Sequence, residues 1–371
     1  METQYIINFE KFLQHRKQIH FVLSLNEVSD LGTKDMPDYI KNMYKFIFEN
    51  IYDKYYILLD MTDEDIRDLY KNLPLNAVFY TYKPHSIFDD SGEKGKRITK
   101  ILNLLSSRKD IHLFINNNYS GSKIYTQKQL NNKKFFIPGC FEKEDIESTI
   151  GFPVVAKPDF GHSGVGIKKI DNMEELNIFL NTIENKDDYI FTQFIDFKAE
   201  FRAFYVDQKL VYLAQRIDKE DKNISIRNKK SDDRMQFVYV IQDFNRIPFL
   251  KELSTINKEI VEIFPEKVYS LDFFLTKNDE LKIIEINTQT GLDPYRLVIL
   301  YESLYKFNYH TNLPIDKKTL IDDIKNIFIN YSYNKYSNEI DKSFYPIDYK
   351  NIVVNSQLKK DLENYNSKIL L

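Results

Sequence analysis

The chain has 371 residues, of which 43% are hydrophobic, and it includes 26 tyrosines and 28 phenylalanines. This length exceeds the usual size of one hydrophobic core, so we expect two or three folded lobes. The 52 basic and 55 acidic side chains leave a net charge of −3. Such a balance gives no overall field that attracts a polyanion, so binding of nucleic acid is not expected.

Cysteine content and hydropathy favour a cytoplasmic protein without a membrane role. The only cysteine, Cys140, cannot form an internal disulfide, and we interpret it as a small packed side chain rather than as a nucleophile. The first residues, METQYIINFEKF, carry acids and lack the apolar centre of a signal peptide. No apolar run approaches the roughly 18 residues that a membrane helix needs.

The amino-terminal part alternates strand-like and helical patterns. Apolar runs at 55–61, 76–82 and 111–117 are typical of strands, and a helical pattern covers 94–107. This alternation predicts a small α/β lobe with a parallel sheet over residues 1–118.

A second region, residues 119–195, begins with a helix and continues with a strand, a glycine-rich loop and another strand. A helix should then begin at Asp171, because Glu174 three residues later completes a capping-box pattern. The strand-like sequence YIFTQFI closes this region.

The third region, residues 196–310, begins with AEFRAFYVDQKLVYLAQRI, which we interpret as a hairpin that turns at Asp207 and Gln208. A helix stopped by Pro265 follows, and then the strands VYSLDFFLT and LKIIEIN. The apolar positions of this helix are Leu250, Leu253, Ile256, Ile260, Val261 and Phe264.

The remaining tail, residues 311–371, reads as largely helical from Pro314 onward and carries no visible chemistry. Its apolar stripe consists of Leu320, Ile324, Ile327, Phe328 and Tyr331.

The sequence AKPDFGHSGVGIKKI places Lys157 ahead of Gly161, Gly164 and Gly166. The order G-x-x-G-x-G is neither the dinucleotide fingerprint nor a P-loop. Because the loop joins two strands, its backbone amides could close over a phosphate chain while Lys157 reaches the same phosphates. A glycine-rich hairpin with an ordinary surface lysine is the alternative.

Three oxygen-bearing side chains follow on two neighbouring strands. Asp272 lies in one strand, and Glu285 and Asn287 lie two apart in the next, so the latter two face the same side of a sheet. Their apolar neighbours suggest burial, which would be costly for unpartnered carboxylates. Such a set suits Mg²⁺ completed by nucleotide phosphates. The alternative is a pair of solvated carboxylates.

Taken in order, these motifs resemble the ATP-grasp superfamily, and particularly its ribosomal-protein glutamate ligase and D-alanine:D-alanine ligase branches. The match extends from about Asn116 to Leu292 and includes GFPVVAKPDFGHSGVGI, EFRAFYV, SLDFFL and EINTQTGL. The resemblance implies an α/β (α+β) ATP-grasp fold with an N-terminal pre-ATP-grasp lobe (1–118). A central subdomain (119–195), a C-terminal subdomain with the magnesium site (196–310) and a helical extension (311–371) follow.

The resemblance also implies the roles of individual residues. Arg202 and Arg216 would be catalytic, close to the phosphates and an acyl phosphate, and Asp272, Glu285 and Asn287 would hold Mg²⁺, with Mn²⁺ as a substitute. The residues that it implies for ATP are Lys123, Lys157, Gly161, His162, Ser163, Gly164, Gly166, Gln193, Phe194, Ile195 and Glu200. The adenine edge would meet backbone groups around Gln193 and Phe194.

The implied activity is ligation of a carboxylate to an amine through an acyl phosphate, with ADP and phosphate released. The substrates would be small molecules, peptides or proteins, and a homodimer is left open. A nonenzymatic ATP-binding protein of the same fold is the alternative, although it would not need all three metal ligands.

Two departures qualify the match. Gln193 stands where these ligases usually carry glutamate. The loop after Arg216 corresponds only roughly to a region near the acyl phosphate, and Arg227 and Asn228 are candidates there, with a solvated charged loop as the alternative.

Overall fold

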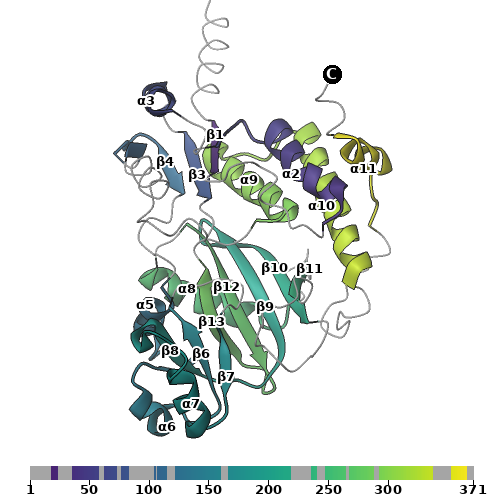
Figure 1. The fold of residues 1–371 in the computed structure, drawn as a ribbon. Coiled ribbons are helices and arrows are strands. Elements are labelled where there is room, and N and C mark those ends of the chain that lie inside the picture. Colours follow the sequence, from purple (N-terminus) through teal and green to yellow (C-terminus); the bar gives the residue numbers. More distant parts are fainter. Residues whose placement is uncertain are drawn as a thin grey trace, which may run out of the picture. The chain divides into compact units, whose positions relative to one another are not determined.

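Figure 1 shows the structure, a computed structural model of the chain. The residues that it describes are 18–23, 36–57, 62–72, 77–82, 104–105, 107–114, 122–159, 166–218, 235–239, 247–264, 267–287, 292–336 and 352–365. One compact unit comprises Met1–Asn116, Gly291–Lys335 and Asp348–Leu371, and the other comprises Asn117–Thr290 and Tyr336–Ile347. Within the described ranges, no helix is long and apolar enough to cross a membrane.

The first unit contains a four-stranded parallel sheet in the order β2-β1-β3-β4. The strands are β1 (Ile19–Leu23), β2 (Lys54–Ile57), β3 (Val78–Tyr82) and β4 (His112–Phe114). The parallel sheet predicted from the alternating pattern is therefore present. Strand β1 was not predicted, and the predicted helix over 94–107 lies largely outside the described residues.

Helices from both ends of the sequence complete this unit. They are α2 (Asp38–Asn50), α3 (Asp63–Asn72), α9 (Pro294–Tyr309), most of α10 (Ile315–Tyr336) and α11 (Ser356–Glu363). Tyr52, which follows α2, donates a hydrogen bond to the Leu297 carbonyl of α9. On α10, Ile324, Ile327 and Phe328 of the predicted stripe are buried, whereas its end residues Leu320 and Tyr331 are partly exposed.

The second unit begins with a smaller sheet in the order β5-β8-β6-β7, in which all neighbours are antiparallel. Its strands are β5 (Gly139–Cys140), β6 (Val154–Pro158), β7 (Lys168–Ile170) and β8 (Tyr189–Gln193). Its helices are α5 (Lys123–Leu130), α6 (Ile146–Thr149) and α7 (Met173–Leu180), with 3₁₀ turns at Lys143–Asp145 and Lys186–Asp188.

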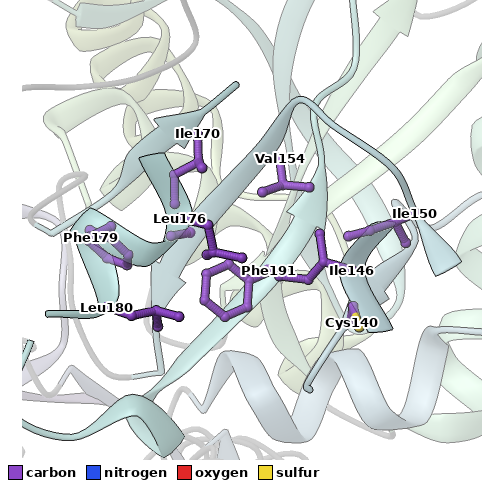
Figure 2. Packing of buried hydrophobic residues seen from close by; sticks show 10 residues of the cluster. Cys140, Ile146, Ile150, Val154, Ile170, Leu176, Phe179, Leu180 and Phe191 are labelled. Atoms are coloured by element: carbon purple, nitrogen blue, oxygen red, sulfur yellow. The ribbon is translucent and has the colours of Figure 1, made fainter. Parts of the chain in front are cut away.

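Apolar side chains of the sheet and of α6 and α7 form the core of this part (Figure 2). Phe191 of β8 lies among Ile146, Leu176 and Leu180 in that cluster. Cys140 is buried in the same cluster, where burial raises the pKa of its thiol. It packs as predicted.

The predicted start of α7 was wrong by two residues. Helix α7 begins at Met173, and the Asn172 side chain accepts a hydrogen bond from the backbone amide of Glu175. Glu175 in turn accepts from the amide of Asp171. The capping partners are therefore Asn172 and Glu175, because an asparagine side chain caps as well as an aspartate does.

A larger antiparallel sheet, in the order β11-β10-β9-β12-β13, forms the rest of this unit. Its strands are β9 (Phe197–Val206), β10 (Lys209–Asp218), β11 (Met235–Tyr239), β12 (Val268–Thr276) and β13 (Leu281–Asn287), and α8 (Leu250–Ile263) lies between β11 and β12 in sequence. The predicted hairpin joins β9 to β10 through Asp207 and Gln208, both with positive φ. Phe249, beside α8, contacts the rings of Phe201 and Phe273.

The two sheets are linked through the segment before β5. Phe136 forms a parallel bridge with Ile283 of β13, and the amide of Ile283 donates to the Phe135 carbonyl at 2.7 Å. The amide of Ile137 donates to the Ile283 carbonyl at 3.2 Å. These hydrogen bonds fix α5, which ends shortly before them, relative to β13.

Candidate active site

The three predicted metal ligands lie beside one another on β12 and β13. In the strand register Asp272 is opposite Glu285, and Ser270 is opposite Asn287. The amide nitrogen of Asn287 donates to Oδ2 of Asp272 at 3.1 Å. Since residues paired across two strands project from the same face, the register brings all three side chains together.

The expectation that both carboxylates are buried holds for Asp272 and is wrong for Glu285. Asp272 is 5% exposed, whereas the Glu285 side chain is 33% exposed. Strand β12 is buried along its whole length, but several positions of β13 are partly exposed. Of the two apolar neighbours of Glu285, Ile286 is buried and Ile284 is partly exposed.

Arg202 of β9 forms a two-point ion pair with Asp272. Its Nε and Nη2 each lie 2.6 Å from a different carboxylate oxygen of Asp272. The pairing follows from the register, which places Arg202 directly opposite Asp272. This fork geometry is the strongest that a guanidinium makes with a carboxylate.

The two predicted phosphate-binding lysines, which come from the smaller subdomain, both interact with Glu285. Lys123, the first residue of α5, places its Nζ 3.7 Å from Oε1 of Glu285. Lys157 of β6 has its pKa lowered to about 8, chiefly by burial. Glu285 and Glu200 act against this shift, and the charge of Lys123 adds to it. Electrostatic coupling among these four side chains means that both subdomains contribute to one charged site.

Asp159 anchors Lys123, and sequence reasoning missed it. Its Oδ1 accepts hydrogen bonds from the Ser122 hydroxyl at 2.7 Å and from the Ile124 amide at 2.8 Å. Its carbonyl accepts from the amide of Lys123 at 3.3 Å. The start of α5 is thus bonded to the residue that follows β6. No local signal marks this contact, because the partners are more than 30 residues apart.

In the segment predicted to bind adenine, residues 193–195, two backbone amides donate hydrogen bonds within the protein. The amide of Gln193 donates to the Pro138 carbonyl at 2.9 Å, and the amide of Phe194 donates to the Pro153 carbonyl at 3.0 Å. A ligand at this edge would therefore meet carbonyl groups or the amide of Ile195, the third residue in the prediction. The Phe194 ring has Nζ of Lys169 4.9 Å from its centre.

Other predicted residues are placed only in part. Glu200 is buried on β9 and lies opposite Arg216 in the strand register. Arg216 is therefore on the same sheet face as Arg202. The side chain of Arg216 is not among those described. Gly166 has a φ of +76°, which favours glycine. The candidates Gly161, His162, Ser163, Gly164, Arg227 and Asn228 lie outside the described residues.

The donor set fits a hard divalent cation that shares its coordination with phosphates. No group of three His, Cys, Asp or Glu side chains within the described ranges is arranged to hold a metal ion. Asp272, Glu285 and Asn287 instead bring two carboxylates and one amide group to the same face of β12 and β13. Mg²⁺ favours such a partial protein set because it retains waters and phosphate oxygens. The surrounding cations Lys123, Lys157 and Arg202 suit a polyanionic ligand.

Comparison with solved structures defines the fold. The ATP-grasp ligase PsnB complexed with minimal precursor superposes with a TM-score of 0.52 at 9% identity, over 77% of this chain and 98% of that chain. The N5-carboxyaminoimidazole synthetase from Staphylococcus aureus complexed with ADP gives a TM-score of 0.51 at 11% identity, over 80% and 78% of the two chains. The protein therefore has the predicted mixed helix-and-sheet ATP-grasp fold.

Sequence comparison narrows the relationship. Residues 126–303 match the family model described as the D-ala D-ala ligase C-terminus. A D-alanine–D-alanine ligase from Bacillus cytotoxicus is 25% identical over 203 residues, which are 47% of this chain and 51% of the relative. The match thus spans about half the length of that relative. The resemblance to ATP-grasp ligases that the sequence predicts is confirmed.

Proposed function

We propose that this protein is an ATP-dependent ligase that joins a carboxylate to an amine through an acyl phosphate and releases ADP and phosphate. The observation that carries the proposal is that charged side chains from two subdomains contribute to one site. Lys123 and Lys157 come from the smaller subdomain, and Arg202, Asp272 and Glu285 come from the larger sheet. A nucleotide held between two such subdomains would have cations and a metal site around its phosphates.

Each group has a distinct task in this proposal. Asp272, Glu285 and Asn287 would hold Mg²⁺, which would offset the negative charge of the phosphates during transfer. Lys123 and Lys157 would hold the nucleotide phosphates in place. Arg202 and Arg216, on one face of the hairpin, would stabilise the phosphoryl group as the substrate carboxylate attacks it.

After phosphoryl transfer, the acyl carbon would be attacked by an amine, which expels phosphate and forms an amide. The glycine loop after Lys157 would exclude water, because water would hydrolyse the acyl phosphate. No covalent link to the protein is needed. Two structural neighbours support the proposal that the protein binds a nucleotide and a precursor substrate, since one was solved with ADP and the other with a minimal precursor. The acceptor would be an amino acid, a peptide or a protein side chain.

The first experiment measures nucleotide products with purified protein. ATP and Mg²⁺ alone are compared with the same mixture plus pooled amino acids and peptides, and ADP, AMP and phosphate are quantified. The proposal predicts ADP and phosphate in equal amounts, only when a carboxylate and an amine are both present. Nucleotide binding without stimulated ADP release would instead favour the nonenzymatic alternative.

A further inference from the structure

The candidate metal ligand Asp272 is fully engaged in the structure. Arg202 holds both of its carboxylate oxygens at 2.6 Å, and Asn287 donates to Oδ2 as well. Asp272 is 5% exposed, so water contributes little to its solvation. In this arrangement the guanidinium occupies the role that a metal cation would take.

A divalent cation bound to Asp272 would be strongly repelled by Arg202 at its present position. Both cations would share one buried carboxylate, where like charges are poorly screened. Moving Arg202 away without a new partner would leave a buried charge unpaired, which is also costly. The site therefore resists a cation that arrives alone.

Nucleotide phosphates would remove this cost, because they offer the guanidinium another two-point acceptor. Guanidinium groups bind phosphate oxygens with the same fork geometry that they use with carboxylates. The strand register keeps Arg202 beside Asp272, so the guanidinium starts from a position next to the candidate metal ligand.

We propose that Arg202 closes the metal site in the nucleotide-free protein and transfers its guanidinium from Asp272 to the phosphates when the metal–nucleotide complex binds. This inference rests on the proposed function and adds an order of events to it. Asp272 becomes a metal ligand only as Arg202 leaves it, so metal and nucleotide enter together. Free metal ions alone do not occupy the site.

The test measures Mn²⁺ binding by electron paramagnetic resonance, with and without ADP, so that turnover is not the readout. For the wild-type protein we expect weak binding of Mn²⁺ alone and at least about tenfold tighter binding with ADP, the equivalent of one charge-assisted hydrogen bond. In Arg202→Gln, the amide can still donate to Asp272 but the positive charge is gone. Mn²⁺ alone should then bind at least about tenfold more tightly than to wild type, whereas Mn²⁺–ADP should bind more weakly.

Two further variants separate the exchange from a general effect of charge. Lys198→Gln removes one positive charge from the same strand, where Lys198 pairs with the exposed Asp279. It should change neither affinity by more than about twofold, because exposed pairs contribute little. Arg202→Lys keeps the charge but loses the two-point geometry. Its affinities for Mn²⁺ alone and for Mn²⁺–ADP should lie between those of the wild type and of Arg202→Gln. Circular dichroism confirms that each variant is folded.

Opposite shifts in the two affinities for Arg202→Gln would support the exchange. Equally tight binding of Mn²⁺ to the wild type with and without ADP would overturn it and leave the proposed ligase intact. A fall in both affinities for Arg202→Gln would also overturn it, because Arg202 would then support the metal ligands. If the wild type bound neither ADP nor Mn²⁺–ADP, both the exchange and the proposed function would fail.

Discussion

At the scale of one residue, burial and neighbouring charges act in opposite directions on the pKa of Lys157. Burial lowers its pKa to about 8, although Glu285 and Glu200 favour its charged form. In the unfolded chain a lysine remains charged to a much higher pH. The folded protein therefore favours the protonated form of Lys157 less than the unfolded chain does, and a bound anion would favour that form again.

This balance predicts a pH dependence of nucleotide binding. Below pH 8 Lys157 is protonated and attracts phosphates, whereas above pH 8 binding must first restore the proton, so affinity falls by up to about tenfold per pH unit. We expect ADP affinity, measured by calorimetry from pH 7 to 9.5, to be flat at first and to begin falling near pH 8. Lys157→Met should bind weakly throughout and lack this fall. A wild-type profile matched by Lys157→Met would contradict the phosphate role.

Glu285 should matter more for turnover than for binding. Glu285→Gln keeps the size of the side chain but removes charge from the candidate metal site, where charge moves during phosphoryl transfer. We expect ATP turnover to fall on the order of a hundredfold and ADP affinity to fall less than about tenfold. Glu280→Gln, at an exposed residue that pairs with Lys282, is the matched control. Equal losses in turnover and affinity would mean that Glu285 only supports the site.

Asp159 makes the start of α5 dependent on β6 at the scale of elements. Asp159→Ala removes the acceptor of the Ser122 hydroxyl and of the Ile124 amide, so Lys123 should lose its fixed position. We expect a stability loss of about 1 kcal/mol, as for a lost helix cap, and weaker ADP binding. Asp159→Asn retains Oδ1 and should restore most of both. Unchanged ADP affinity in folded Asp159→Ala would show that Asp159 stabilises α5 without positioning Lys123.

The turn between β9 and β10 carries local strain that a substitution can relieve. Asp207 and Gln208 have φ values of +48° and +64°, which suit a two-residue hairpin turn but disfavour glutamine. Gln208→Gly should therefore raise the free energy of unfolding by about 1 kcal/mol, measured in urea. Lys209→Gly, within β10, should lower it because glycine weakens strands. Destabilisation by both would contradict this account of the turn.

Local patterns predicted many elements because their causes are local. The hairpin at Asp207 and Gln208 follows from a polar pair between two apolar strands, and the β12–β13 pair follows in the same way. Strand β1 was missed because no glycine or proline marks the ends of IHFVL. The capping of α7 shifted because two adjacent residues can both cap.

Contacts between residues that are far apart in the sequence could not be predicted from local patterns. The Ser122–Asp159 hydrogen bond joins residues 37 apart, and the Arg202–Asp272 pair joins residues 70 apart. Motif order predicted that Arg202 and Asp272 share a site, but not that they bind each other. That detail depends on strand register and on the charge that burial leaves uncompensated, and neither is local.

At the scale of the whole molecule, the candidate nucleotide and metal residues lie in one of the two compact units. Lys123 and Asn287 mark the limits of the set, and both fall within Asn117–Thr290. The other unit combines Met1–Asn116 with Gly291–Lys335 and the end of the chain, and none of the candidate residues lies in it. The four-part division of the chain stays a prediction.

The central claim is that a carboxylate is activated by phosphorylation, and the fate of its oxygen tests this most directly. Once pooled substrates that stimulate ADP release are resolved to one carboxylate and one amine, the carboxylate is labelled with ¹⁸O. Mass spectrometry then follows the label in phosphate, AMP and product. We predict that one ¹⁸O atom per turnover appears in phosphate, with ADP formed, because the acyl phosphate breaks at its acyl carbon. Label in AMP, with pyrophosphate released in place of ADP, would mean activation by adenylation and would contradict the proposed mechanism.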